Sequence, residues 1–205
     1  LPGGARFVSV SDDNYAKLWT LDGARERTIL MLGSRVNCVA ALPDGVHFAV
    51  GLYDRNVRLY HVDGTLVHTF KSSIEGYTHG VQAVAVTPDG QHIISGADDH
   101  LVKVWSVATK SLVSTCEGHI GTVYAVAAMP DGKRILSGAN DRSVRVHLLD
   151  GARKNIFELH EFAVTALVAL PDNQHALSGS SDKTVKLFNV SNCDGLRTFR
   201  PHAGA

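Results

Sequence analysis

The feature that most constrains this chain is an internal repeat. Five segments share an apolar stretch, a group of small or polar residues that includes an aspartate, and a second stretch in which apolar and polar residues alternate. They are FVSVSDDNYAKLW (7–19), FAVGLYDRNVRLY (48–60), IISGADDHLVKVW (93–105), ILSGANDRSVRVH (135–147) and LSGSSDKTVKLF (177–188). Between their aspartates the successive intervals are 41, 45, 42 and 41 residues. Self-similarity at a nearly fixed period predicts an array of small structural units, each of which buries its apolar face against its neighbours.

The fourth repeat shows what one unit contains. Its four short stretches of apolar and β-branched residues are SLVST (111–115), VYAVAAM (123–129), KRILSG (133–138) and SVRVHLL (143–149). Short runs of this kind, separated by Gly, Pro and Asp turns, predict the strands of a sandwich, a barrel or a propeller. A period of about 40–45 residues is that of a propeller blade. We therefore expect an all-β fold built from four-stranded antiparallel units.

The repeat resembles that of the WD40 family of β-propellers. The segment GHIGTVYAVAAMPDGKRILSGANDRSVRVH (118–147) is similar to the family pattern of Gly-His, an inner strand, Pro-Asp-Gly, Ser-Gly, Asp and a terminal aromatic residue. Five in-phase copies cover essentially the whole chain, although the Trp-Asp pair that names the family is absent from all of them. The resemblance implies one WD40-type propeller segment over residues 1–205.

The resemblance also implies a hydrogen-bonded clamp in each blade, formed by one His, one Ser or Thr, one Asp and one Trp. From the first repeat to the fifth, the matching residues are Ser9, Asp13 and Trp19; Asp54 alone; Ser95, Asp99 and Trp105; His119, Ser137 and Asp141; and His160, Ser178 and Asp182. His147 and Phe188 occupy the Trp position in the last two repeats. Because the second repeat retains a single member, we predict that polar contacts hold its blade less tightly.

Ser137, His119 and Asp141 also have the composition of a hydrolase triad. The same three residue types recur in the fifth repeat, and partial sets recur elsewhere. An enzyme has no use for a nucleophile in every blade, whereas buried polar groups in every blade must be paired. The sequence therefore favours a structural role for these residues and no catalytic site.

No motif for a metal ion, a cofactor or a phosphate group is present. The eleven histidines form no HxxxH or HExxH pair, and neither GxxxxGK[ST] nor GxGxxG occurs. Cys38, Cys116 and Cys193 are far apart, which favours free thiols in a reducing compartment. With no apolar run of membrane-spanning length and no leader visible at Leu1, we expect an intracellular, cytoplasmic protein without a membrane partner.

The charge balance gives no electrostatic reason to expect nucleic acid as a partner. Lys plus Arg and Asp plus Glu are both 20, so the formal net charge is +0. Basic residues gather in the fourth repeat, with three aspartates among them: Lys133, Arg134, Arg142, Arg145, Arg153 and Lys154, and Asp131, Asp141 and Asp150. A solvated surface of mixed charge is favoured over a nucleic-acid patch.

The resemblance implies that a protein or peptide partner binds at one end of the propeller, near the central channel. The positions that flank the start of each inner strand, or precede the clamp aspartate, are Arg35, Asn37, Tyr53, Gln82, Asp98, Thr122, Tyr124, Asn140, Thr165 and Ser181. Aromatic and Arg residues dominate interface energetics, so Tyr53, Tyr124 and Arg35 are the preferred anchors.

The interval of 45 residues adds a second candidate region. Its extra residues lie in KSSIEGYTHG (71–80), on the connection that enters the third blade. Long loops on a rigid scaffold are frequent functional sites, although a tolerated surface insertion explains this one equally well. On the functional hypothesis, Ile74, Tyr77 and His79 contact the partner together with Tyr53.

The expected function is a non-catalytic scaffold for protein–protein interaction and complex assembly. The alternative is a regulatory or sensor propeller attached to an enzyme, such as a kinase or signalling NTPase, in a longer chain. A ubiquitin-ligase substrate receptor is less favoured because the W-D-x-R motif of such adaptors is absent. We expect an open arc of a larger ring that lacks the inner strand of its first or last blade, with further repeats or domains in the parent chain. A closed ring of five blades, with His202 paired to Ser9, Asp13 and Trp19, is less favoured.

Overall fold

The computed structural model describes residues 1–30, 33–71, 80–192 and 195–200. Every regular element in these ranges is a β-strand, and no helix there is long and apolar enough to cross a membrane. The predicted all-β class is confirmed.

The strands form five antiparallel sheets, three strands in the first and four in each of the others. We call these sheets the first to fifth blades. The first contains β1 (Arg6–Val10), β2 (Tyr15–Thr20) and β3 (Arg25–Leu30). The second contains β4 (Val36–Ala41), β5 (His47–Leu52), β6 (Asn56–His61) and β7 (Leu66–Lys71). The third contains β8 (Val81–Val86), β9 (His92–Ala97), β10 (Val102–Ser106) and β11 (Leu112–Cys116). The fourth contains β12 (Val123–Ala128), β13 (Arg134–Ala139), β14 (Val144–Leu148) and β15 (Arg153–Phe157). The fifth contains β16 (Val164–Ala169), β17 (His175–Ser180), β18 (Val185–Asn189) and β19 (Gly195–Phe199).

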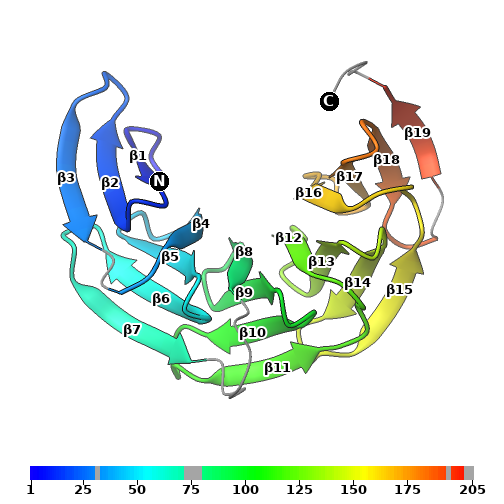
Figure 1. Ribbon diagram of the computed structural model, residues 1–205, viewed down its shortest axis with the longest axis horizontal. Helices are drawn as coiled ribbons and strands as arrows, with labels where there is room; N and C mark the ends of the chain where they lie inside the picture. The colour runs from blue at the N-terminus through cyan, green and yellow to red at the C-terminus, as the bar shows by residue number, and fades with distance from the viewer. Residues whose placement is uncertain (31–32, 72–79, 193–194, 201–205) are drawn as a thin grey trace.

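The blades follow one another around an open arc, and the two chain ends lie at its two free ends (Figure 1). The strands β4, β8, β12 and β16 line the inner side of the arc, whereas β7, β11, β15 and β19 form its outer rim. The open arc of propeller-type blades expected from the sequence is therefore confirmed.

One detail of the sequence reading is wrong. The four stretches assigned to the fourth repeat are strands, but they do not form one sheet. β11, which contains most of SLVST, pairs with β10 in the third blade, and the fourth blade takes β15 as its outer strand instead. The first strand of a repeat is thus the outer strand of one blade, and its other three strands belong to the next blade. Each repeat therefore links two consecutive blades.

Turn chemistry explains why each blade folds back at the same places. In the fourth blade, Asp131 accepts a hydrogen bond from the backbone N–H of Lys133 at 2.8 Å, and Gly132 adopts φ 66°. The fifth blade has Asn173 in the glycine position, with φ 58°. Gly and Asn are the residues that adopt this left-handed conformation at the lowest free-energy cost, so the sequence at this position favours the turn.

Packing between blades depends on a glycine near the end of the second strand. A Cβ atom on Gly138 would lie 2.5 Å from Cγ1 of Val164, which is the first residue of the next inner strand. Gly51 meets Val81 and Gly96 meets Val123 in the same way. Each missing side chain lets a buried valine of the following blade enter. A Gly-to-Ala change at such a site is expected to cost about 1–3 kcal/mol through overpacking.

Candidate binding face

In every blade, the aspartate of the repeat closes a tight turn. Asp141 accepts a hydrogen bond from the backbone N–H of Ser143 at 3.0 Å, and Asp13, Asp54, Asp99 and Asp182 make the same contact two residues on, at 2.9–3.1 Å. The residue between has positive φ each time: Asn14, Arg55, His100, Arg142 and Lys183. Because this backbone region is unfavourable for most side chains, the aspartate contact stabilises a turn that would otherwise be strained.

The fourth and fifth blades contain the His–Ser–Asp arrangement. His119 places Nδ1 2.8 Å from Oδ2 of Asp141 and Nε2 2.8 Å from Oγ of Ser137. His160 has the same contacts with Asp182 at 2.8 Å and Ser178 at 2.7 Å. Asp141 also accepts a hydrogen bond from the backbone N–H of Ile120, and Asp182 accepts one from that of Glu161, both at 3.1 Å. Each set therefore ties the connection before the inner strand to the second strand and to the turn.

Hydrogen bonds within these sets favour the ionised form of both aspartates. Burial alone would raise the pKa of Asp141, but hydrogen bonds from His119 and Ser143 outweigh it and hold the pKa well below its usual value. The pKa of Asp182 is lowered likewise, because bonds from Thr184 and His160 outweigh burial. Burial lowers the pKa of His147 to about 4, and the nearby charges of His119 and Arg145 act in the same direction.

The first and third blades contain the Trp–Ser part of the clamp. Nε1 of Trp19 donates to Oγ of Ser9, and Nε1 of Trp105 donates to Oγ of Ser95, both at 2.8 Å. In place of a histidine, the Lys103 ammonium donates a hydrogen bond to Oδ2 of Asp99 at 3.0 Å. Lys17 and Asp13 form the same pair more loosely, at 3.5 Å.

In the second blade, apolar packing replaces most of the clamp. Asp54 pairs with Arg58 at 2.6 Å and its backbone N–H donates to Oγ of Ser34 at 2.7 Å. Val50 and Tyr60 stand where other blades have Ser and Trp, and both are buried.

In the first four repeats the aspartate pairs with a basic residue four positions on, which was not predicted from the sequence. The basic residues at this position are Lys17, Arg58, Lys103, Arg145 and Lys186. The signal was available, because D-x-x-x-[KR] occurs in all five repeats. The pair is closest where the repeat offers no histidine, at 2.6 Å for Arg58 and 3.0 Å for Lys103, and it opens to 3.9 Å for Arg145 in a blade that has one.

The geometry of Ser137 differs from that of a nucleophile. Its side chain is fully buried and its Oγ lies between two imidazoles, 2.8 Å from His119 and 3.1 Å from His147. Burial raises the pKa of Cys38 to about 12 and that of Cys116 to about 11, so neither thiol is activated. Within the described ranges, no group of three His, Cys, Asp or Glu side chains could hold a metal ion.

A bulge at the start of each inner strand presents the sequence-predicted candidates. The strand register shifts between Val36 and Cys38, and the same shift occurs at the second residue of β8, β12 and β16. The bulged residues are Asn37, Gln82, Tyr124 and Thr165. A bulge redirects a side chain and interrupts regular pairing, so these four residues occupy equivalent positions on one face of the arc.

Backbone hydrogen bonds bring the turn residues to the same face of the arc. The N–H of Tyr53 donates to the carbonyl of Arg35 at 2.9 Å, and that of Asn140 to Thr122 at 2.8 Å. Asp98 and Ser181 make equivalent bonds to Gly80 at 3.1 Å and Ala163 at 3.0 Å. We call the bulged residues and these turn and connection residues the candidate face.

Some candidates are engaged within the protein and others are exposed. Nε2 of Gln82 donates to both carboxylate oxygens of Asp98, at 3.1 and 3.0 Å. Arg35 forms an ion pair with Asp12, and its guanidinium carbon lies 5.8 Å from the centre of the Tyr53 ring. Tyr53 is 47% exposed and Tyr124 38%. The two tyrosines are therefore the accessible aromatic candidates.

Two exposed apolar residues beside the candidate face were not predicted from the sequence. Ile120 is 82% exposed and Phe162 is 59% exposed. Both lie in the short connection that follows a clamp histidine, where a solvated loop rarely needs a large apolar side chain. Of the sequence candidates, Ile74, Tyr77 and His79 lie outside the described residues.

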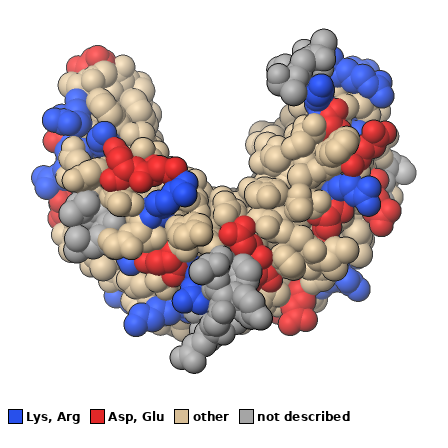
Figure 2. Space-filling model, viewed as in Figure 1, with Lys and Arg blue, Asp and Glu red and all other residues tan. Residues whose placement is uncertain are grey.

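Charges of both signs are interspersed on the face of the arc shown in Figure 2, with uncharged residues between them. A surface of this kind suits a polar ligand better than a polyanion.

Comparison with known proteins identifies the repeat. The family model described as WD domain, G-beta repeat matches residues 28–61, 64–106, 110–147 and 151–189. Cilia- and flagella-associated protein 52 of Homo sapiens is 29% identical over 99 residues, which are 48% of this chain and 16% of that protein. WD repeat-containing protein 1 of Bos taurus is 33% identical over 112 residues, which are 54% of this chain and 18% of that protein. The matched part of this chain thus spans less than a fifth of either relative.

Proposed function

Because the chain belongs to the WD40 repeat family, we propose that it is a non-catalytic scaffold that assembles a protein complex by binding a peptide segment of a partner at the candidate face. Its membership and its relatives support a protein-interaction role. The finer assignment depends on one observation: four successive inner strands carry a bulge at the same position. Four side chains, one from each of these blades, are thereby presented on one face of the arc.

The composition of the candidate face favours a polar peptide with a few apolar anchors. Tyr53 beside Arg35 offers an aromatic surface next to a cation, and Tyr124 lies two blades further along the arc. The rigid ring of tyrosine contributes a large contact area to interfaces, and Tyr and Arg are both enriched among interface hot spots. Ile120 and Phe162 extend this set with apolar area.

The test compares partner capture by matched variants. We expect Tyr53→Ala and Tyr124→Ala to lower the recovery of bound proteins about tenfold or more, as for interface hot spots. Leu66→Ala is the control, because Leu66 is 48% exposed but lies on the outer strand β7. Quantitative mass spectrometry of affinity-purified complexes gives the readout. Equal recovery with all three variants would place the interaction elsewhere.

The segment 71–80 stays a sequence-based proposal. If Ile74, Tyr77 and His79 contribute, deleting residues 72–74 should weaken the same partners that Tyr53→Ala loses. The alternative of a propeller attached to an enzyme is decided by the sequence that flanks residues 1–205. A cytoplasmic location likewise remains a proposal, supported by free Cys38 and Cys116.

A further inference from the structure

A pocket of about 380 Å³ adjoins the candidate face at the fourth blade. Its lining comes from the connections that enter the fourth and fifth blades, from the turn between β13 and β14, and from β14 and β15. Ile120 lines it two residues before Thr122, and Asp141 lines it directly after Asn140. Thr122 and Asn140 belong to the candidate face, so a peptide bound there can reach the pocket. Its volume lies within the range of about 300–1,000 Å³ that is usual for ligand pockets.

One wall of this pocket is apolar where the other blades are polar. In every blade, the basic residue four positions after the repeat aspartate pairs across the sheet with a residue of the outer strand. That residue is Thr28, Thr69, Thr115 and Thr198 in four blades, and Ile156 in the fourth. Thr and Ile are both β-branched and both suit a strand, so strand formation does not require the exchange. Ile156 is 40% exposed, so burial within the blade does not require it either.

Ile120 is a second apolar exception, on the connection that enters the fourth blade. Its side chain lines the same pocket and is 82% exposed. The residues at the corresponding position of other repeats are Gly33, Thr78 and Glu161. Single exposed apolar residues are common on protein surfaces, whereas apolar residues gathered at one place indicate a binding site. Here two isoleucines line one pocket, each at a position that is not apolar in the other repeats.

The backbone of Ile120 is held in place before any ligand binds. Its N–H donates to Oδ2 of Asp141 at 3.1 Å. The position that a Cβ atom of Gly121 would take is 3.0 Å from the backbone nitrogen of Asp141, so the connection packs closely on the turn. A binding group that is already ordered loses less conformational entropy on association.

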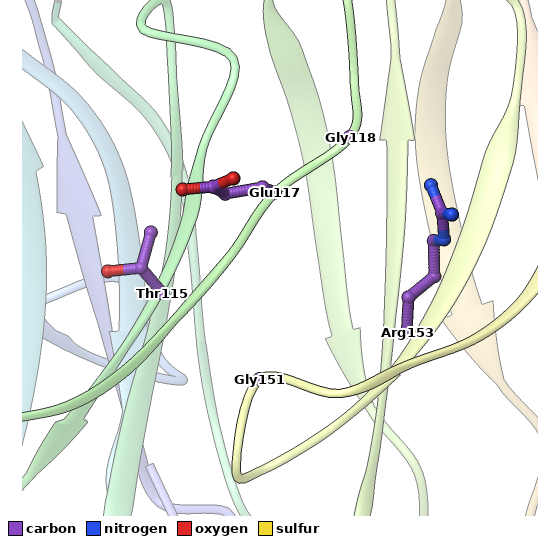
Figure 3. A pocket seen from close by; sticks show the side chains of 5 residues that line it. All are labelled: Thr115, Glu117, Gly118, Gly151 and Arg153. Carbon is purple, nitrogen blue, oxygen red and sulfur yellow. The ribbon is translucent and has the colours of Figure 1, made fainter.

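A neighbouring pocket at the third blade lacks this apolar wall. Thr115 stands there in the position of Ile156, and Figure 3 shows it beside Glu117, with Arg153 on the opposite side of the pocket. The five described residues that line that pocket are Thr115, Glu117, Gly118, Gly151 and Arg153, and none has a large apolar side chain. The isoleucines therefore distinguish the pocket of the fourth blade.

The charges around the pocket of the fourth blade are balanced. Its charged lining residues are Asp141, Glu158, Arg142 and Arg145, two of each sign. His160 also lines it, and burial lowers the pKa of this imidazole, which favours its neutral form. A balanced lining gives no electrostatic preference for a charged ligand. The two isoleucines favour an apolar one, because binding removes their exposed surface from water.

We propose that this pocket binds an uncharged aliphatic side chain, that of Leu, Ile, Val or Met, between Ile120 and Ile156. The proposal rests on the proposed function, because the side chain belongs to the peptide that binds the adjoining candidate face. The pocket thus adds a specificity for one aliphatic residue to a face that otherwise offers polar and aromatic contacts.

The test is a titration followed by NMR of the purified chain with labelled isoleucine methyl groups. The probe is a blocked pentapeptide with leucine between two pairs of glycines, and its counterparts carry lysine or glutamate instead. We expect the leucine peptide to shift the Ile120 and Ile156 signals in a saturable manner. The signals of Ile93 and Ile135, which have 0% exposure, should stay unchanged. The lysine and glutamate peptides should bind at least about tenfold more weakly.

Two variants assign the binding to the pocket. Ile156→Thr introduces the residue that the other four blades have, so the blade should still fold, and it should weaken the leucine peptide about tenfold. Ile120→Thr should act in the same direction, with the Ile156 methyl group as the reporter. Val113→Thr is the matched control, because Val113 is 46% exposed on the outer strand β11 and should not affect binding.

Three results would overturn the proposal. They are no saturable shift with the leucine peptide, equal or tighter binding of a charged peptide, and equal weakening by Ile156→Thr and Val113→Thr. Partner recovery separates this proposal from the proposed function. If Tyr53→Ala lowers recovery while Ile156→Thr changes neither recovery nor the titration, the pocket proposal alone fails. If the leucine peptide binds the pocket while the tyrosine variants recover every partner, the proposed function of the candidate face alone fails.

Discussion

The second and fourth blades have the same strand order but different internal contacts. In the fourth, Ser137 lies between His119 and His147, and Asp141 holds the first histidine. In the second, the equivalent space contains Val50 and Tyr60, and the Tyr60 ring lies 5.8 Å from that of Phe48. Both interiors are closed, since Ser137, His147, Val50 and Phe48 all have 0% exposure. One blade geometry can therefore be stabilised by a satisfied polar network or by apolar packing.

The largest expected effect comes from removing apolar volume in the second blade. Phe48→Ala should lower the free energy of unfolding by about 3–5 kcal/mol, because it leaves a cavity where no clamp compensates. Ile135 occupies the matching position of the fourth blade and is equally buried. Chemical unfolding should show a smaller loss for Ile135→Ala. An equal or larger loss there would mean that the two blades do not differ in what stabilises them.

Removing the shared hydroxyl should affect the fourth blade almost as much. Ser137→Ala leaves Nε2 of both His119 and His147 without a partner, and each unsatisfied buried group costs about 1–3 kcal/mol. We expect a loss of about 3 kcal/mol in urea unfolding. Ser181→Ala, at an exposed serine, is the control and should be neutral. A loss below about 0.5 kcal/mol for Ser137→Ala would show that the network contributes little.

The stability of the fourth blade should also depend on pH, through His147. Because burial holds the pKa of His147 at about 4, below the unfolded value, the unfolded chain binds more protons between roughly pH 6.5 and 4. Stability therefore falls as pH decreases through this window, by about 2 kcal/mol between pH 7 and pH 5 from this residue.

His147→Phe tests this pH dependence. It should remove most of that slope, because Phe188 shows that a phenyl ring fits the equivalent position of the fifth blade. The free energies of unfolding of both proteins are measured at the two pH values. An unchanged slope would assign the effect to other groups.

The smallest effect concerns amide exchange. The sequence predicts faster exchange in residues 36–60 than in 164–188, because the second blade has the fewest clamp residues. The structure offers a sharper reference, since β16 lies at the free end of the arc and exposes Thr165, Ala166 and Val168. Residues 123–147 are enclosed on both sides, and we expect 36–60 to exchange faster than they do, by about tenfold or less. Equal rates would show that apolar packing fully replaces the clamp.

The sequence predicted the clamp set residue by residue in the blades that retain it, because a hydrogen-bonded set requires particular side chains at fixed spacing. It did not reveal that Arg58 and Lys103 take over where the histidine is missing, although their spacing from the aspartate is constant. It also placed Tyr53 and Tyr124 among the candidates without showing how they come to lie on one face of the arc. That depends on bulges, which arise from how two strands pair and leave little trace in either strand alone.

The sequence by itself determined the period, the all-β class and the turns, since each depends on local chemistry. Alternating apolar and polar residues favour strands, and turns form at Pro-Asp-Gly and where an aspartate accepts a hydrogen bond from the backbone N–H two residues on. Only the tertiary structure decided which strands share a sheet, how a glycine of one blade admits a valine of the next, and how Ile120 and Ile156 come to line one pocket. These features join residues of different repeats. Their energies depend on distances between separate sheets, which no spacing along the chain specifies.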